Sequence, residues 1–379
     1  MEGGREAAEL LGWTAKQGRI VTANGQAATL YVPERGFPFQ PEECPHHHLL
    51  QGTTHSAFSS WASQNTSRNL VCGAFFRPLF VGGWEHTSDV DEVVYNVQTN
   101  TLFIDMRIPR LGRKLLAGVA GLGEMDADQL KLYARRHAFA GYTRLQHENG
   151  RPVCTRHHCV DWNFVGAPRP RPNKWYVEMH PDESMWKEWA YARDDFGQHY
   201  YWERWQRLQR DGNGRGFVLA MRKERREDDS RDEIIVAVGD HFSYIRGRAA
   251  AKTGPYADKA SAVDLVDAAV DAGDRGAAEA CLSIDAGHGS VSEGWVIDCA
   301  LQHWKEGSRL LAGASVAVSG SGAGPCRVLI DQRPWEVYEC SVGPEDLEAV
   351  LRWGGAPDGG GGDMEAKLLN PAERSPSKL

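Results

Sequence analysis

Residues 92–108, EVVYNVQTNTLFIDMRI, carry the clearest β-hairpin pattern in this sequence. Apolar and polar side chains alternate along 92–98 and again along 101–108, and the pair Thr99-Asn100 separates the two runs. Alternation with a period of two is typical of a strand that buries one face, and a two-residue break between two such strands predicts a tight turn. This hairpin indicates an antiparallel β fold, and the rest of the sequence extends the pattern.

Short segments with the same alternation recur along most of the chain. Asn24-Gly25, a pair that accepts positive φ, lies between the runs 19–24 and 27–32 and predicts a second hairpin. Further strands are expected at 78–86, 152–163, 173–180, 185–191, 197–208, 215–222, 232–238, 241–247, 294–303, 313–319, 326–332 and 335–341. Short, irregularly spaced strands predict an antiparallel meander, and closing the meander into a barrel removes its exposed edges. We therefore predict a mainly β fold, an antiparallel β-barrel with two or three short helices and long loops.

Capping residues predict where the helices begin. Asp126 begins one helix that ends before Gly141, and Ser261 begins another near 261–281. A short third helix is expected at 344–352.

The predicted organisation has four parts. They are N-terminal strands with a loop insertion over 1–77, a β-barrel core over 78–306, C-terminal strands with a short helix over 307–353, and a disordered tail over 354–379. The length of the chain favours two domains, but the strand pattern favours one elaborated barrel with additions at both ends.

Composition and charge exclude several classes of protein. The 379 residues include 43 basic and 51 acidic side chains, a formal charge of −8, and the hydrophobic fraction of 41% is enough for a large core. The acidic balance argues against a nucleic-acid binder that depends on neutralising phosphates. No apolar run reaches the ~20 residues needed to span a bilayer, and the N-terminus lacks the apolar core of a signal peptide. Because the eight cysteines are thinly spread, as in a reducing compartment, we expect a cytoplasmic protein.

The most polar predicted strand is 152–162, PVCTRHHCVDW. Strict alternation places His157 and Asp161 on the same face, close enough for the carboxylate to act on the imidazole directly or through water. Such a pair could supply a base near neutral pH, with Glu203 as a further catalytic candidate. The alternative is a hydrogen-bonded histidine inside a barrel, because His–Asp pairs are common and nothing in the sequence identifies a nucleophile.

Three other predicted strands carry charged and aromatic side chains at alternate positions. The candidate ligand-binding residues on these strands are Asp105, Arg107, Tyr201, Arg207, His241 and Arg246. If the polar faces line one lumen, the arginines could bind a carboxylate or phosphate through paired hydrogen bonds, and the aromatic rings could enclose an apolar body. The alternative is that the same charges lie on the solvated outer face and contribute little.

Two clusters of cysteine and histidine raise the question of a metal site. Cys44-Pro-His46-His47-His48 and Cys154-x-x-His157-His158-Cys159 together offer enough ligands for zinc. Neither cluster has the spacing of a two-Cys, two-His finger, so we predict no metal site and leave the cofactor unknown. A variant of the ligand-binding hypothesis is that the barrel holds haem through His157 or His241, which the absorption spectrum of the protein tests.

Three of these segments together resemble a lipocalin-like, calycin-type family of largely uncharacterised β-barrel proteins. The resemblance covers about 78–306 and rests on VVYNVQTNTLFIDMRIPR (93–110), CTRHHCVDW (154–162) and GDHFSYIRGR (239–248). The matching positions are Asp105, Arg107, Ile108 and Pro109, then Cys154, Thr155, His157 and Asp161, and then Gly239, Asp240, His241 and Phe242. A fainter resemblance is to the yeast Hri1-type proteins, which are built from two lipocalin-like barrels. The family implies a fold rather than a reaction.

Three functions are compatible with these patterns. The first is a lipocalin-like barrel that binds a small amphipathic or anionic ligand in its lumen, with Arg107 or Arg207 meeting an anionic group. The second is an enzyme that uses the same cavity, and the pair His157 and Asp161, for the proton-transfer chemistry of an isomerase, lyase or hydrolase. The third is an interaction scaffold whose protein partners stay unknown. We rank ligand binding first, with neither nucleic acid nor a membrane span among the expected partners, and we leave catalysis open.

Overall fold

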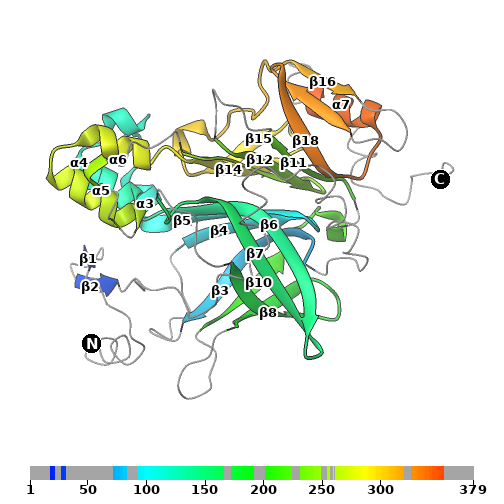
Figure 1. Ribbon diagram of the computed structural model, residues 1–379, viewed down its shortest axis with the longest axis horizontal. Coiled ribbons are helices and arrows are strands. Elements are labelled where there is room, and N and C mark those ends of the chain that lie inside the picture. Colours follow the sequence, from blue (N-terminus) through cyan, green and yellow to red (C-terminus); the bar gives the residue numbers. More distant parts are fainter. Residues whose placement is uncertain are drawn as a thin grey trace.

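The computed structural model describes a closed barrel, a second large antiparallel sheet, a two-stranded hairpin and a group of helices (Figure 1). The described residues are 18–21, 27–30, 71–82, 92–165, 172–191, 201–214, 216–223, 231–248, 254–256, 259, 261–319 and 326–353. A separate hairpin, β1 (Gly18–Val21) and β2 (Ala27–Leu30), confirms the strand pair predicted on either side of Asn24-Gly25.

Eight antiparallel strands close into a barrel, which confirms the predicted mainly β fold. In chain order they are β3 (Gly73–Gly82), β4 (Glu92–Gln98), β5 (Leu102–Pro109), β6 (His137–Glu148), β7 (Arg151–Asp161), β8 (Asn173–Met179), β9 (Met185–Ala190) and β10 (Tyr201–Arg207). Each strand pairs with the next, and β10 returns to pair with β3, so that Glu203 lies opposite Phe80. Closure leaves the barrel without a free edge.

The strands that follow form a second sheet in the order β15-β14-β13-β12-β11-β18-β17-β16. They are β11 (Val218–Lys223), β12 (Glu233–Val238), β13 (His241–Arg246), β14 (Asp285–Ser290), β15 (Val296–Ala300), β16 (Val316–Ser319), β17 (Arg327–Ile330) and β18 (Arg333–Cys340). The barrel strands thus lie within 73–207 and those of the second sheet within 218–340. The four-part division of the chain stays a prediction.

Helix α7 (Pro344–Trp353) fills one face of the second sheet. Its Leu347 side chain belongs to the apolar core on that face. The carbonyl of Val350 accepts the indole N–H of Trp295 at 3.0 Å beside one edge strand, and Glu348 accepts the N–H of Val318 at 3.1 Å on the other. The helix therefore contacts both edges of the sheet.

The other face of the second sheet covers the outside of barrel strands β4 to β6 (Figure 1). Ile104 and Met106 from β5 and Ile234 from β12 belong to one buried core. Burying a side chain of this size stabilises the fold by about 1.5–3 kcal/mol. Because successive side chains on a strand point to opposite sides, this packing turns Asp105 and Arg107 into the barrel.

Four helices gather at one end of the molecule (Figure 1). They are α3 (Arg110–Leu115), α4 (Ala127–Tyr133), α5 (Ala262–Asp271) and α6 (Arg275–Cys281). Asp126 and Gln129 form a capping box at the start of α4, and Ser261 accepts the N–H of Asp264 at the start of α5. With α7, the described chain has five α-helices, more than the two or three expected.

Two strands lie where the sequence predicted none. The helix predicted up to Gly141 ends at Tyr133, and β6 begins at His137 because its pairing with β5 and β7 outweighs local helix propensity. Strand β14 has the sequence DAGHGS, which has low β propensity, yet it pairs with β13 on one side and β15 on the other. Both strands are determined by their neighbours.

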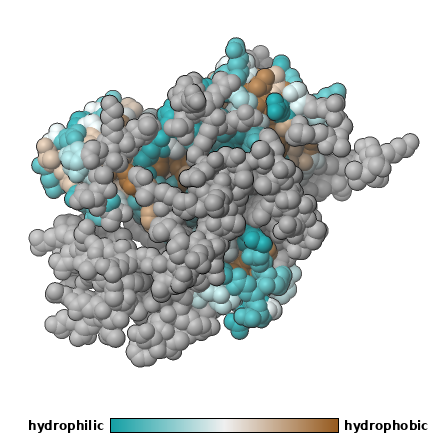
Figure 2. Space-filling view, in the orientation of Figure 1, coloured by the Kyte–Doolittle hydropathy of each residue, from teal (hydrophilic) through white to brown (hydrophobic). Residues whose placement is uncertain are grey.

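Figure 2 shows that the described surface on the face in view is mainly hydrophilic, with small scattered apolar areas. Among the described residues, the exposed large hydrophobic side chains are Leu115 and Leu329. In the same part of the chain, no helix is long and apolar enough to cross a membrane.

Candidate functional site

The inward face of β5 places Asp105 among arginines. Asp105 is fully buried, accepts hydrogen bonds from Arg107 at 2.9 and 3.3 Å, and lies 3.4 Å from the Arg156 guanidinium on β7. Burial alone would raise the pKa of Asp105, but the charges of Arg107, Arg156 and Arg77 together lower it. Asp105 is therefore ionised and holds two guanidinium groups in place.

Arg77 on β3 extends this network across the barrel. It donates to Glu203 on β10 and to Glu92 on β4, both at 2.7 Å, and Glu203 also lies 3.8 Å from Arg107. The side chains of Arg77 and Glu203 are almost fully buried, whereas Arg107 is 22% exposed and Glu92 is 20% exposed. The charged network thus reaches from the interior to the barrel end at which β4 begins and β5 ends.

Glu188 on β9 lies directly opposite Glu203 on β10. Its carboxyl group accepts the Tyr201 hydroxyl at 2.8 Å and the indole N–H of Trp205 at 3.2 Å. Burial, and then the charge of Glu203, raise the pKa of Glu188 to about 8. At neutral pH Glu188 is therefore mostly protonated, which lowers the repulsion between the two facing carboxyl groups.

Aromatic rings pack beside the charged network inside the barrel. The indoles of Trp186 and Trp205 stack at 5.5 Å, and Phe75 meets Trp186 edge-on at 5.8 Å. The Arg156 guanidinium lies 5.0 Å from the ring centre of Trp175. The interior thus combines hydrogen-bonding groups with large apolar surfaces.

Several buried hydrogen-bonding atoms in the barrel have no partner within the described chain. Asn96 on β4 is fully buried opposite Asp105, and neither atom of its amide makes a hydrogen bond. Glu203 Oε2 and the indole N–H groups of Trp175 and Trp186 also lack partners. Buried polar atoms are nearly always paired in proteins, so these atoms mark positions that a bound molecule or ordered water would complete.

A β-bulge in β7 changes which histidine meets Asp161. Ala140 lies opposite Val160 and Gly141 opposite His158, so Cys159 is an additional residue in the strand. The alternation of side chains reverses at this residue.

His158 therefore makes the hydrogen bond that the sequence assigned to His157. His158 Nδ1 lies 2.6 Å from Asp161 Oδ2, and its ring stacks on Phe139 at 5.1 Å. The expected pairing of His157 with Asp161 assumed unbroken alternation, which the bulge removes. Catalytic roles for His157, Asp161 and Glu203 stay a prediction.

Arg207 takes part in a different group of contacts, at the end of β10. Its guanidinium donates to Asp211 at 2.5 Å and to the Cys72 carbonyl at 3.1 Å. These bonds connect β10 to the segment before β3 and to the loop after the barrel.

His241 and Arg246 lie on β13 in the second sheet, not in the barrel. His241 Nε2 lies 2.6 Å from the Gln209 carbonyl oxygen, and Arg246 pairs with Glu233 at 3.0 Å. Of the predicted ligand-binding residues, the barrel interior therefore brings together Asp105, Arg107 and Tyr201. Their ligand-binding role stays a prediction.

Four interior residues were not predicted from the sequence: Arg77, Asn96, Arg156 and Glu188. In the strand 185–190, MWKEWA, Glu188 shares a face with Trp186 and Ala190, and Lys187 shares the other face with Met185 and Trp189. Each face carries one charge and one indole, so alternation alone does not tell which face is interior.

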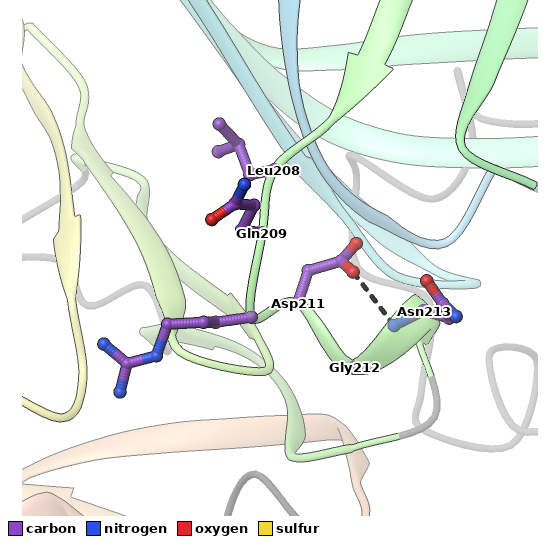
Figure 3. A pocket seen from close by; sticks show the side chains of 6 residues that line it. Leu208, Gln209, Asp211, Gly212 and Asn213 are labelled. Carbon is purple, nitrogen blue, oxygen red and sulfur yellow. Dashed lines mark hydrogen bonds between the residues drawn. The ribbon is translucent and has the colours of Figure 1, made fainter.

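A surface pocket of about 360 Å³ lies on the loop that leads from the barrel to the second sheet, lined by residues 208–213. Figure 3 shows the Asp211 carboxylate directed at Asn213, whose N–H it accepts at 2.9 Å. Asp211 also accepts the N–H of Ala74 at 3.2 Å. Because the Asp211 carboxylate is already bonded to backbone N–H groups, we assign the pocket to the loop that connects the barrel with the second sheet and not to the candidate site.

The two Cys/His clusters offer candidate zinc ligands. The cluster at 44–48 lies outside the described residues, and within the described ranges no three His, Cys, Asp or Glu side chains are grouped to hold a metal. Burial raises the pKa of the Cys154 thiol to about 11, which keeps it protonated and makes it a poor metal ligand.

No protein-family model matches the chain, and no curated protein matches it. Among solved structures, the chain is similar to the uncharacterized protein YLR301w from Saccharomyces cerevisiae, with 11% identity and a TM-score of 0.40. The match covers 71% of this chain and 98% of the yeast chain. The closed barrel itself confirms the barrel part of the predicted resemblance, and membership of a lipocalin-like family stays a prediction.

Proposed function

We propose that the barrel binds a small amphipathic molecule in its lumen. The observation that carries this proposal is the set of buried, unpaired hydrogen-bonding atoms on Asn96, Glu203, Trp175 and Trp186. Each such atom costs roughly 1–3 kcal/mol when left unpaired, so a ligand that pairs with several of them gains affinity. The neighbouring indole and phenyl rings supply surface for the apolar part of the ligand.

Charge balance supports an amphipathic ligand more than a strongly anionic one. Arg77 and Arg107 contact Glu203 or Asp105, and Arg156 contacts Asp105, so each guanidinium already faces a carboxylate. Neutral donors and acceptors, such as amide or hydroxyl groups on an apolar ring, suit the remaining atoms better than a second anion does.

Mass spectrometry of the purified protein tests this proposal. Native spectra and an organic extract should contain a co-purifying small molecule, and Asn96→Leu, which keeps the branched shape of the side chain without polar atoms, should lose it while staying folded. Asn100→Leu is the matched control, because Asn100 bonds Glu339 outside the barrel interior. A crystal structure with only ordered water at Asn96 and Glu203 would contradict the proposal.

The opposed carboxyl groups favour proton transfer as a second candidate function. Glu188, held protonated, lies opposite Glu203 on the neighbouring strand, so the pair supplies a general acid beside a carboxyl group placed to act as a general base, which suits the isomerase, lyase or hydrolase chemistry considered above. Incubating the extracted ligand with protein in D₂O tests this function. Deuterium should enter the ligand with the wild type and not with Glu203→Gln. If the ligand stays unlabelled and unchanged with both proteins, proton transfer is excluded and ligand binding is the remaining function.

We also propose that this protein belongs to a lipocalin-like family and that it is located in the cytoplasm. Among the described residues, seven cysteines are free thiols, which is the state that a reducing compartment maintains.

A further inference from the structure

Arg136 is a buried guanidinium outside the barrel interior. It lies between α4 and β6 and is 1% exposed. Nη1 donates to the Leu301 carbonyl, and the guanidinium carbon lies 4.5 Å from the ring centre of Tyr133. Nη2 is buried without a hydrogen-bond partner, and Arg136 forms no ion pair with any carboxylate of the described chain.

Tyr133 adds a second unused donor at the same place. The side chain is fully buried, and within the described chain its hydroxyl makes no hydrogen bond. Its ring also stacks on Trp304 at 6.2 Å, in the segment that follows β15. Two elements from the first half of the chain and one from the second half therefore enclose the unpaired Nη2 and hydroxyl groups.

The neighbouring carboxylates are engaged with other cations. Glu306 accepts from Arg113 at 2.6 Å, and Asp285 accepts from Lys305. The positive charge of Arg136 also acts on His303, whose pKa is lowered first by burial and then by that charge. No described carboxylate thus forms an ion pair with Arg136, and the charge of Glu306 acts on it only from a longer distance.

Burying a cation without a counter-ion is costly, and the cation–π contact with Tyr133 together with the hydrogen bond to the Leu301 carbonyl offsets only part of that cost. Unpaired buried donors in a native structure call for an explanation, and an ion that completes the site is a common one. Arg136 Nη2 is a donor only, and the Tyr133 hydroxyl can donate beside it, so the pair suits an anion.

We propose that Arg136 and Tyr133 bind a small, singly charged anion, such as a halide, at the junction of α4, β6 and the segment after β15. One guanidinium charge is left to balance, so a monovalent anion neutralises the site. The donor atoms are enclosed by protein, which favours an inorganic anion over an anionic group carried by a larger molecule. The bound anion would stabilise the contact between the helices and the second sheet.

Bromide is the probe for this site. Crystals soaked in sodium bromide should show an anomalous peak within hydrogen-bonding distance of Arg136 Nη2 and the Tyr133 hydroxyl. In solution, replacing sodium gluconate by sodium bromide at constant ionic strength should raise the melting temperature by a few degrees, because a ligand that binds the folded state stabilises it.

Two variants and one control make the test specific. Arg136→Met should abolish the bromide effect, whereas Arg135→Met should retain it, because Arg135 pairs with Asp267 at 3.4 Å instead. Tyr133→Phe keeps the ring and removes the hydroxyl, so it should weaken bromide binding several-fold even if Arg136→Met does not fold. An ordered water in place of the anomalous peak, or equal stabilisation of the wild type and Arg136→Met, would overturn the proposal.

Discussion

Glu188 is the residue whose protonation links the barrel interior to pH. Its carboxyl group titrates near its ordinary pKa of 4.5 in the unfolded chain and at about 8 in the folded protein. As the pH rises between these values, the unfolded chain loses its proton while the folded protein keeps it, so the free energy of unfolding falls. The fall is at most about 1.4 kcal/mol per pH unit.

Glu188→Gln should therefore remove most of the stability loss between pH 5 and pH 8. Urea unfolding followed by tryptophan fluorescence at several pH values in that range measures the effect. Glu178→Gln on β8 is the control, because Glu178 is exposed and its substitution should leave the pH dependence of the wild type unchanged. If the free energy of unfolding fell equally steeply with pH in the wild type and in Glu188→Gln, another group would be responsible for the fall.

Alternation along single strands predicted part of this site. It placed Asp105 and Arg107 on one face of 101–108, and the structure turns both residues into the barrel. It could not assign the partner of Asp161, because the bulge at Cys159 depends on how β7 pairs with β6 and not on the local sequence.

At the scale of secondary-structure elements, the bulge in β7 depends on Gly141 in β6. A Cβ atom at Gly141 would lie 2.0 Å from the His157 carbonyl oxygen and 2.8 Å from the Cys159 nitrogen. Both are backbone atoms held by strand pairing, so they cannot move away without disturbing the ladder. Glycine at this position allows the two strands to approach at the bulge.

Gly141→Ala should destabilise the protein by about 2–3 kcal/mol, through overpacking against backbone. Chemical denaturation measures the loss, and a shifted His158 ring signal in NMR spectra would report the altered bulge. Gly123→Ala is the matched control, because a Cβ atom there meets nothing within 4 Å. Equal stability of the two variants would mean that the strands can separate at low cost.

The elements that the sequence missed have a physical explanation. The predicted extension of the helix after Asp126 was wrong at β6, because strands on both sides supply its hydrogen bonds. Strand β14 is rich in glycine, yet it forms because it lies between two partner strands. Capping residues, by contrast, act locally, and Asp126 and Ser261 do begin the helices expected from them.

At the scale of the whole molecule, the barrel and the second sheet share one core. Ile234 on β12 is fully buried with Ile104 and Met106 of the barrel. Alternation reveals which positions are buried but not which sheet buries them, so it could not separate the strands of the closed barrel from those of the second sheet.

Ile234→Ala should lower the stability of both sheets by about 2–5 kcal/mol in a single transition. Hydrogen exchange of β4 and β5 amides, together with those of β13 and β14, measures both sheets in one experiment. Leu329→Ala is the control, because Leu329 is exposed on β17 and should change little. Faster exchange in the second sheet alone would show that the two sheets unfold independently.

The closing pair of the barrel joins positions far apart along the chain, since Arg77 meets Glu203 126 residues later. A nascent chain cannot complete the barrel until β10 has left the ribosome, and the apolar outer side of β5 stays uncovered until β12 follows. Contacts between residues so far apart in the sequence slow folding and leave partly folded intermediates that are prone to aggregate. We expect this protein to depend on chaperones during its synthesis, with barrel closure and coverage by the second sheet as its late steps.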